Sequence, residues 1–409
     1  GVKVDIDALN SMDKILTKKI KELAENIPVE NPRSPKQVAK MLLGMGFHLP
    51  KTEKGNYKAD EPTLQALSDV TDSDEKKKSL DDLMEYRFHH KLKSTFIDGI
   101  REVMDKHHYI HPIYFIAKRE EYEEKDEEGG TTSGRLSCKR PNFQNIPRDK
   151  EALPREISPR RMFIPRYRGT HIIASSDFTQ AEVILAGIYH KDSKILSMYD
   201  SGGDLHTQIA AEVFGLKPEN VSKDQRKAAK TVVFGVLYGQ TEFGLSKRLG
   251  WTEQKAKEFI RDFFRKFPEL KRGIDEAKHF IIRNGYIESY FKRRRHLPGA
   301  SDDTPYGREL LRSGINAIIQ GGAADLCKIS MWSLFLELDL FNSFMVAQIH
   351  DEVTCEIDKR KKGEFCELVK RLFSNPGLKD YGLEPFPLKI RGEVEMGLNF
   401  LELGEKYVF

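Results

Sequence analysis

Two aspartates stand where apolar strands are expected to end, and a rigid strand end suits a metal-binding carboxylate. Asp177 follows the apolar run HIIASS, and Asp351 lies in QIHDEV, between two apolar stretches. The second pattern predicts a hairpin with Asp351 at its tip and Glu352 pointing to the opposite face. Each aspartate alone is also typical of a polar turn or cap.

The two aspartates are 351 − 177 = 174 positions apart, so only the tertiary structure can bring them together. A carboxylate pair of this kind can hold two Mg²⁺ ions about 3.5–4 Å apart. Oxygen ligands suit Mg²⁺, which keeps waters and takes further ligands from substrate phosphates. The pair therefore predicts metal-assisted chemistry on a phosphate compound, provided that the fold joins the two residues.

A helix-like stretch at 224–239 (DQRKAAKTVVFGVLYG) carries two cations followed by two aromatic residues at every fourth position. These are Arg226, Lys230, Phe234 and Tyr238. At about 100° per residue they form one slanting stripe on a helix. Such a face can hold a triphosphate at one end and stack on a base and sugar at the other. An amphipathic helix with a solvated basic start and a buried aromatic end is the alternative.

Two further polar groups indicate contact with nucleic acid. The loop 131–147 (TTSGRLSCKRPNFQNIP) combines glycine and proline with the polar residues Arg135, Asn142, Gln144 and Asn145. A polar stripe at spacing i, i+4, i+8 is formed by Arg312, Asn316 and Gln320. Such donors suit phosphate and minor-groove contacts. A generic polar loop and a solvated helix face are the alternatives.

The hydrophobic pattern around these residues predicts an α+β fold with a small sheet and large helical parts. Apolar residues at helical spacing predict helices over 5–25, 79–106, most of 204–285, and 308–338. HIIASS predicts a buried strand that is followed by a helix at 179–190. Two strands are expected at 344–357. The acidic and then glycine-rich segment 119–134 is the best candidate linker.

Length and composition narrow the class of protein. The chain has 409 residues, enough for two or three domains. No apolar run is long enough for a transmembrane helix, and the N-terminus lacks the plan of a signal peptide. Four scattered cysteines make a disulfide scaffold or a zinc site unexpected. We therefore expect no membrane partner, no secretion and a reducing compartment such as the cytoplasm.

Several segments in the right order make the sequence resemble the family A DNA polymerases, the DNA polymerase I type. DFTQAE at 177–182 and QIHDE at 348–352 resemble the two palm motifs of this family, and RKAAKTVVFGVLYG resembles its nucleotide-binding fingers helix. TSGRLSCKRPNFQNIP, DLHTQIAAEVFG, FKRRRHLP and INAIIQGGAADL also match, and SPKQVAKMLLGMGFHLPKTEKG resembles the thumb. The resemblance covers essentially the whole chain.

The resemblance implies a right-hand architecture, with a palm built on a small antiparallel sheet and helical fingers and thumb. The expected parts are an N-terminal segment and thumb at 1–130, palm at 131–200, fingers at 201–305 and palm again at 306–409. It implies DNA-templated addition of dNTPs to a primer 3′-hydroxyl with release of pyrophosphate. The implied cofactor is a pair of Mg²⁺ ions, for which Mn²⁺ can substitute. Primer–template DNA and dNTPs are the implied partners of a monomer.

The same resemblance implies a role for each candidate residue. Asp177, Asp351 and the backbone carbonyl of Phe178 would hold the metals, with Glu352 as an auxiliary carboxylate. The expected nucleotide site consists of Arg226, Lys230, Phe234, Tyr238, Glu182, Gln180 and His206. Lys230 would also protonate the pyrophosphate, and Glu182 would exclude a ribose 2′-hydroxyl. The expected DNA contacts are Arg135, Asn142, Gln144, Asn145, Arg312, Asn316, Gln320 and His350.

Some positions depart from the pattern of the family. Phe178, Ala181 and Val233 stand where Tyr, Ile and Asn are usual, and Ala181 beside Glu182 predicts looser selectivity for sugar or base. Arg148-Asp149 replaces a small residue and Arg, and the acidic run 119–128 is expected to be an insertion that points away from DNA. The chain starts where the polymerase module starts, so we expect no proofreading in it.

Two other readings remain open from the sequence. A single-subunit RNA polymerase shares the palm arrangement, although Glu182 disfavours it. A catalytically silent DNA-binding replication factor is disfavoured by the presence of Asp177, Asp351, Arg226 and Lys230.

Overall fold

The structure is a computed structural model that describes residues 1–116, 130–147 and 153–409. The acidic run 119–128 and the dipeptide Arg148-Asp149 lie outside the described residues. The chain forms two compact units, each assembled from separate segments. The first unit comprises Gly1–Ile113, Arg140–Ile172 and Gly397–Leu403, and the second comprises Tyr114–Lys139, Ile173–Met396 and Gly404–Phe409.

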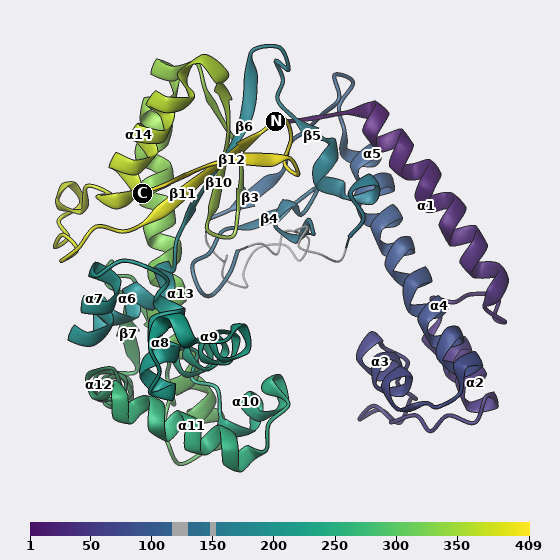
Figure 1. The fold of residues 1–409 in the computed structure, drawn as a ribbon, viewed down its shortest axis with the longest axis horizontal. Coiled ribbons are helices and arrows are strands. Elements are labelled where there is room, and N and C mark those ends of the chain that lie inside the picture. The colour runs from purple at the N-terminus through teal and green to yellow at the C-terminus, as the bar shows by residue number, and fades with distance from the viewer. Residues whose placement is uncertain (117–129, 148–152) are drawn as a thin grey trace. The chain divides into compact units, whose positions relative to one another are not determined.

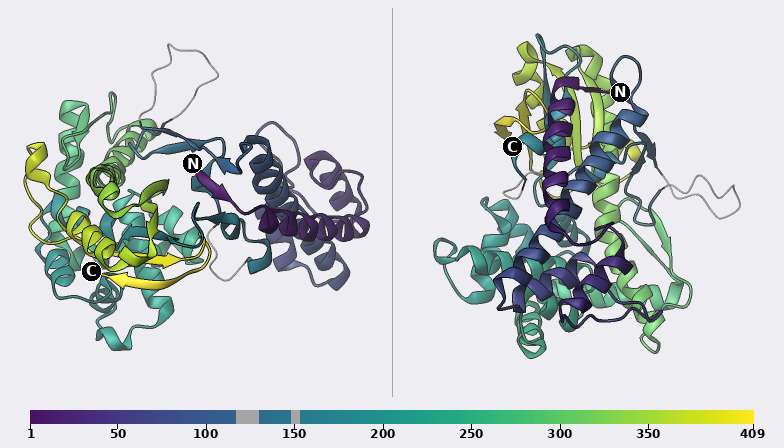
Figure 2. Two further views of the ribbon diagram at one scale, coloured as in Figure 1. Left: turned by 90° about the horizontal axis from the view of Figure 1, so that it is seen from above. Right: turned by 90° about the vertical axis from the view of Figure 1, so that its right-hand side faces the viewer.

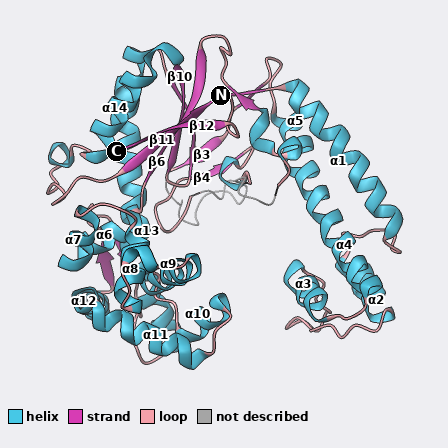
Figure 3. Ribbon diagram, viewed as in Figure 1, coloured by secondary structure: helices cyan, strands magenta, loops and turns pink. Residues whose placement is uncertain are grey.

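The first unit is mostly helical (Figure 3). Its elements are β1 (Val2–Val4), α1 (Ile6–Asn26), α2 (Pro35–Gly44), α3 (Glu61–Val70), α4 (Asp74–Leu92), α5 (Gly99–Val103), β2 (Tyr109–Ile110) and β5 (Phe163–Ile164). The long helices α1 and α4 lie side by side (Figure 2). Strand β1 pairs antiparallel with both β2 and β5.

Apolar side chains from four segments form the core of this helical part. Leu23, Leu42, Leu64, Leu80 and Leu83 are buried together between helices α1 to α4. Local signals set the helix starts, because Ser34 caps α2 with Pro35 in its first turn. The side chain of Asp60 caps α3 in the same way, accepting a hydrogen bond from the Thr63 amide at 3.2 Å.

The second unit is built on a five-stranded sheet in the order β12-β11-β6-β10-β9 (Figure 1). The strands are β6 (His171–Phe178), β9 (Phe344–Ile349), β10 (Glu352–Asp358), β11 (Gly392–Gly397) and β12 (Leu403–Val408). β6 is central, and all six residues of its HIIASS run are buried. β9 and β10 pair antiparallel, with Ile349 opposite Glu352. Two small sheets pair β3 (Ile113–Phe115) with β4 (Ser137–Lys139) and β7 (Tyr286–Glu288) with β8 (Arg294–His296).

Helices make up the rest of the second unit. They are α6 (Ala181–His190), α7 (Ser193–Asp200), α8 (Leu205–Phe214), α9 (Lys223–Leu237), α10 (Glu242–Leu249), α11 (Glu253–Lys266), α12 (Pro268–Asn284), α13 (Pro305–Glu337) and α14 (Lys362–Ser374). The long helix α13 packs against α6, α12 and α14 and also contacts β10. Within the described ranges, no helix has both the length and the apolar character that crossing a bilayer requires.

These elements confirm the predicted order of helices, strand, helices and strand pair. The first strand, the helix after it, the long helix and the hairpin all form where the pattern placed them. The helix expected over 79–106 differs, because it starts earlier, at Asp74 after the cap Ser73, and ends at Val103. A π-helical turn over Lys93–Asp98 interrupts it. The division into thumb, palm and fingers stays a prediction.

A buried histidine makes the stability of the second unit depend on pH. His190 at the end of α6 is 6 % exposed, and its Nε2 has no partner among the described residues. Burial lowers its pKa to about 4, although a hydrogen bond with the Gly273 backbone acts in the opposite direction. The unfolded chain therefore binds the proton more tightly, with a pKa near the ordinary 6.5.

We predict that this contribution to stability is complete above pH 6.5 and is lost as the pH falls from 6.5 towards 4. At pH 5 the loss is about 1 to 2 kcal/mol. His190→Gln should flatten this part of the pH profile in urea unfolding, whereas His279→Gln, at an exposed position of α12, should leave it unchanged. An unaltered profile for His190→Gln would contradict the assignment.

Candidate active site

Asp177 is held at the end of the central strand β6. Its side chain is half-buried, and its Oδ1 accepts a hydrogen bond from the amide of Phe178 at 2.8 Å. Phe178 is buried and stacks on Phe373 of α14, with the ring centroids 4.6 Å apart. This stacking fixes the backbone next to Asp177, including the carbonyl that the sequence analysis assigned to a metal.

Asp351 lies in the tight turn of the β9–β10 hairpin, as predicted. Ile349 and Glu352 pair across the hairpin, so His350 and Asp351 form a two-residue turn. His350 is exposed and adopts a φ of 62°, which lets the chain reverse. Asp351 is half-buried, whereas Glu352 is buried within β10 and accepts a hydrogen bond from Thr354. Glu352 is therefore held within its strand, and its auxiliary role stays a prediction.

The structure brings the two aspartates to the same place. β6 and β10 are neighbours in the sheet, and the charges of both carboxylates raise the pKa of one buried thiol, that of Cys327 on α13. Burial raises the pKa of Cys327 to about 12, and the charges of Asp351 and Asp177 add to this increase. The Cys327 thiol also donates to the backbone oxygen of Asp351 at 3.7 Å. The sequence separation of 174 positions is thus closed by the fold.

Glu182, in the first turn of α6, connects this region to helix α9. Its Oε1 accepts a hydrogen bond from Arg135 at 2.8 Å, and its Oε2 accepts one from the hydroxyl of Tyr238. Burial raises the pKa of Glu182, the charge of Asp351 raises it further, and Tyr238 and Arg135 lower it in part. Glu182 and Tyr238, both predicted for the nucleotide site, are therefore in contact, and Arg135, predicted to contact DNA, joins them.

The predicted stripe on α9 forms a continuous row. Lys230 Nζ lies 5.8 Å from the centre of the Phe234 ring, and the Phe234 and Tyr238 rings are 5.8 Å apart. Tyr238 is the residue directly after the helix, at its C-cap. Ser222 and Gln225 form a capping box at the start of α9, which fixes the helix end that carries Arg226.

Asp204, which the sequence analysis did not single out, anchors the cationic end of the stripe. Arg226 donates two hydrogen bonds to its carboxylate, at 2.7 and 2.8 Å. Gln180 donates a third at 2.8 Å, and Asp204 also caps α8 through Thr207. Burial alone would raise the pKa of Asp204, but the bonds from Arg226 and Thr207 lower it well below its usual range. The position of Asp204 just before the helix is typical of a cap and can be recognised in the sequence, whereas its ion pair with Arg226 depends on the fold.

His206 completes the wall beside the stripe. Its ring is 3 % exposed and lies 5.6 Å from that of Phe234, and its Nδ1 has no partner among the described residues. Burial lowers the pKa of His206 to about 4, and the charges of Lys230 and Arg226 favour the same direction. The imidazole is therefore neutral at pH 7 and still has a ring nitrogen to offer to a ligand.

The predicted DNA-contact residues fall into two groups. Arg312, Asn316 and Gln320 lie on α13, and Gln320 interacts with the hydroxyl of Tyr238. Gly239, with a φ of 66°, packs directly on the side chain of Arg312, where any Cβ would collide. In contrast, Asn142, Gln144 and Asn145 belong to the first unit, where Asn142 caps a short 3-10 helix through the Gln144 amide.

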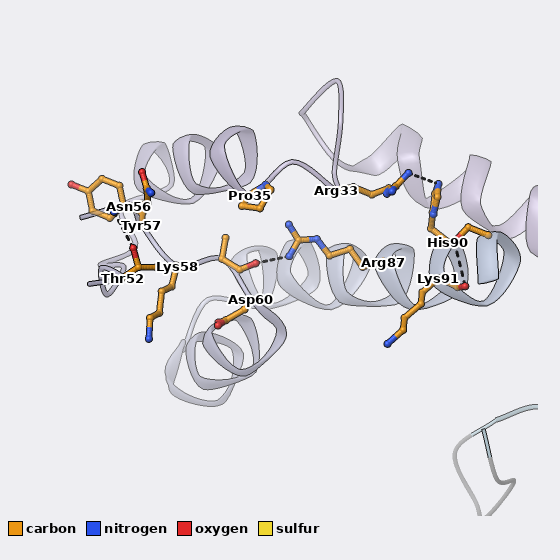
Figure 4. A pocket seen from close by; sticks show the side chains of 12 residues that line it. Arg33, Pro35, Thr52, Asn56, Tyr57, Lys58, Asp60, Arg87, His90 and Lys91 are labelled. Atoms are coloured by element: carbon orange, nitrogen blue, oxygen red, sulfur yellow. Dashed lines mark hydrogen bonds between the residues drawn. The ribbon is translucent and has the colours of Figure 1, made fainter. Parts of the chain in front are cut away.

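A second candidate site is a cationic pocket of about 580 Å³ in the first unit (Figure 4). Its lining includes Arg33, Lys58, Arg87, His90 and Lys91, with Asp60 as the acidic member. Arg87 donates to the backbone oxygens of Pro32 and Ala59, while its Nη2 is buried without a partner in the described part of the chain. The sequence predicted a thumb in this part of the chain, but the cations of the pocket come from separate segments and give no local pattern.

The contact between Glu182 and Tyr238 gives a direct test of this geometry. Tyr238→Phe removes a hydrogen bond that stabilises the ionised carboxylate, so we predict that the pKa of Glu182 rises further. A ¹³C-carboxylate NMR titration would measure this, with Glu182→Gln used to assign the signal. Tyr189→Phe removes a hydroxyl that bonds a backbone oxygen elsewhere, so it is the matched control. An unchanged Glu182 titration in Tyr238→Phe would contradict the contact.

Comparison with known proteins places these features in one family. The chain is 34% identical over 363 residues to DNA polymerase I of Streptococcus pneumoniae (strain ATCC BAA-255 / R6), covering 87% of this chain and 39% of that protein. It is 31% identical to DNA polymerase I of Caldicellulosiruptor bescii, covering 98% and 45%, and 31% identical to the thermostable DNA polymerase I of Thermus aquaticus, covering 97% and 45%. The chain thus spans less than half the length of these relatives.

A solved structure supports the same conclusion and confirms the predicted right-hand polymerase architecture. The POL domain of Pol1 from M. smegmatis, in complex with DNA primer-template and dNTP, matches 99% of this chain and 68% of its own at a TM-score of 0.84 and 25% identity. The model of DNA polymerase family A matches residues 6–402. The chain therefore belongs to DNA polymerase family A.

Proposed function

We propose that this chain is a DNA-templated DNA polymerase that adds dNTPs to a primer 3′-hydroxyl and releases pyrophosphate. The observation that carries the proposal is the position of Asp177 and Asp351 in one sheet, with Asp177 at the end of β6 and Asp351 in the turn that leads into its neighbour β10. Family membership and the connected row of side chains from Asp204 to Glu182 support it. We further expect a monomer that works in a DNA-containing compartment.

Divalent metal ions are the implied cofactor, and the residues present fit them. Asp177 and Asp351 offer hard oxygen donors on half-buried side chains, and the carbonyl of Phe178 is a third candidate ligand. In the described ranges no group of three or more His, Cys, Asp and Glu side chains forms a metal site. A pair of Mg²⁺ or Mn²⁺ ions would therefore take its other ligands from water and the triphosphate. When bound, it supplies Lewis-acid activation of the 3′-hydroxyl and neutralises phosphate charge.

The cations of α9 suit the triphosphate of an incoming dNTP. Lys230 is proposed to bind the phosphates and to give a proton to the departing pyrophosphate. Arg226 uses Nε and Nη2 for Asp204, so the ion pair fixes the plane of the guanidinium while Nη1 remains for a phosphate oxygen. Neutral His206 can donate a hydrogen bond to the same phosphates, and Gln180 holds Asp204 in place.

The aromatic end of the row suits a base and a deoxyribose. Phe234 and Tyr238 offer ring faces for stacking. Glu182 is in contact with Tyr238 and Arg135, and we propose that its carboxylate occupies the place where a ribose 2′-hydroxyl would point. This arrangement favours dNTPs and disfavours the reading of the chain as an RNA polymerase.

DNA is the proposed partner of both cationic regions. Arg135, Arg312, Asn316, Gln320 and His350 are proposed to contact the primer–template near its end, and Asn142, Gln144 and Asn145 to contact it from the first unit. In the pocket around Arg87, the charge of Asp60 partly compensates that of Arg87, while Arg33, Lys58 and Lys91 also line it, so the pocket suits a backbone phosphate. Phosphate contacts of this kind fix the position of a duplex without reading its sequence.

We predict that Asp351→Ala reduces extension of a labelled primer by about 10³-fold or more, since one of two metal-binding carboxylates is lost. Binding of the primer–template, measured by fluorescence anisotropy, should change little. Asp339→Ala, at an exposed position next to α13, is the control and should extend normally. Strong residual synthesis by Asp351→Ala would overturn the metal assignment, and a parent that binds DNA without extending it would indicate a silent DNA-binding factor.

We also predict that Glu182→Ala raises the ratio of rNTP to dNTP incorporation by at least about 10-fold, because the side chain that excludes the 2′-hydroxyl is gone. Single-nucleotide incorporation with matched rNTP and dNTP measures the ratio. Glu182→Gln keeps the bulk of the side chain and should keep most of the discrimination. Equal ratios in the parent and Glu182→Ala would remove Glu182 as the sugar filter.

A further inference from the structure

The strand that leads to Asp351 is at the edge of its sheet, and one tyrosine covers part of that edge. β9 ends the strand order β12-β11-β6-β10-β9, so among the described residues one side of this strand has no neighbouring strand in this sheet. The hydroxyl of Tyr114, on β3, donates to the oxygen of Gln348 at 3.0 Å and accepts from the amide of Gln348 at 3.0 Å. A single hydroxyl thus satisfies both backbone groups of a residue three positions before Asp351.

The two carbonyl oxygens of the turn are also bound by side chains. The side-chain Nε2 of Gln348 donates to the backbone oxygen of His350 and lies 3.9 Å from the sulfur of Cys327. The Cys327 thiol in turn donates to the oxygen of Asp351 at 3.7 Å. Gln348 and Cys327 are both buried, at 4 % and 2 % exposed, so water does not readily replace these bonds.

We propose that Tyr114 and Cys327 are positioning residues that hold the turn carrying Asp351 in the geometry that binds a divalent cation. The inference rests on the proposed function, because it takes Asp351 as a metal ligand. Tyr114 fixes the strand before the turn, and Cys327 fixes the carbonyl of Asp351 itself. Neither side chain is proposed to contact the metal ion, so both act through the backbone of residues 348–351.

Substitutions that remove only one or two side-chain atoms separate this role from ordinary packing. Tyr114→Phe keeps the ring and removes only the hydroxyl that bonds Gln348. Cys327→Ala removes the donor to Asp351, whereas Cys327→Ser keeps a donor at the same position. Tyr189→Phe is the matched control, because its hydroxyl donates to the backbone oxygen of Glu288 at 2.9 Å, in the same unit but away from the turn.

The test measures metal binding and turn mobility directly. Binding of Mn²⁺ to the chain without DNA is followed by the electron paramagnetic resonance signal of the free ion, with Asp351→Asn identifying the ions held at this site. Hydrogen exchange of a peptide covering 344–358 reports on the hairpin. We expect Tyr114→Phe and Cys327→Ala to weaken Mn²⁺ binding by about 10-fold, as typical for loss of an outer-shell partner, and to speed exchange of this peptide.

The activity of each variant should follow its affinity for Mn²⁺. In primer extension, Tyr114→Phe should raise the Mg²⁺ concentration for half-maximal rate while leaving the KM for dNTP close to that of the parent. Cys327→Ser should recover most of the loss seen in Cys327→Ala, and Tyr189→Phe should match the parent throughout.

The result that would overturn the inference is a Tyr114→Phe variant with the parent's Mn²⁺ affinity and hydrogen exchange. An equal change in Tyr189→Phe would also overturn it, since the effect would then be a general loss of stability. If the parent extends no primer, the proposed function fails, whereas weaker Mn²⁺ binding by Tyr114→Phe would still support the positioning role.

Discussion

The proposed activity depends on holding two like charges close together. Asp177 and Asp351 both lie near the buried thiol of Cys327, which offers no charge compensation, as its raised pKa indicates. Each carboxylate is fixed by rigid backbone: one ends the buried central strand and the other sits in a two-residue turn. Two carboxylates held in this way suit divalent cations, whose charge balances theirs.

The cationic side of the site follows a related arrangement. Arg226 is paired with Asp204, and Gln180 and Thr207 complete the partners of that carboxylate, so three helices meet at one half-buried ion pair. Removing one partner would leave an uncompensated charge. Together with Glu182, which binds Tyr238 and Arg135, these contacts fix both ends of the row on α9 before any nucleotide arrives.

Much of the fold and of the site could be predicted from the sequence, and the limits have physical causes. The strand before Asp177, the hairpin at Asp351 and the row from Lys230 to Tyr238 rest on local periodicity, which a sequence displays. Asp204 and Tyr114 were missed because their partners are 22 and 234 positions away. Glu352 was expected to assist catalysis, yet it is buried in its strand; its role and those of the other site residues stay predictions.

The most direct test of the central claim is a crystal structure of the chain with primer–template, a non-hydrolysable dNTP and Mn²⁺, with anomalous scattering used to locate the metal. The account predicts Mn²⁺ peaks in contact with the carboxylates of both Asp177 and Asp351 and with phosphate oxygens of the nucleotide. Peaks that contact only one of these aspartates, or no peak beside them while the nucleotide is bound, would contradict it.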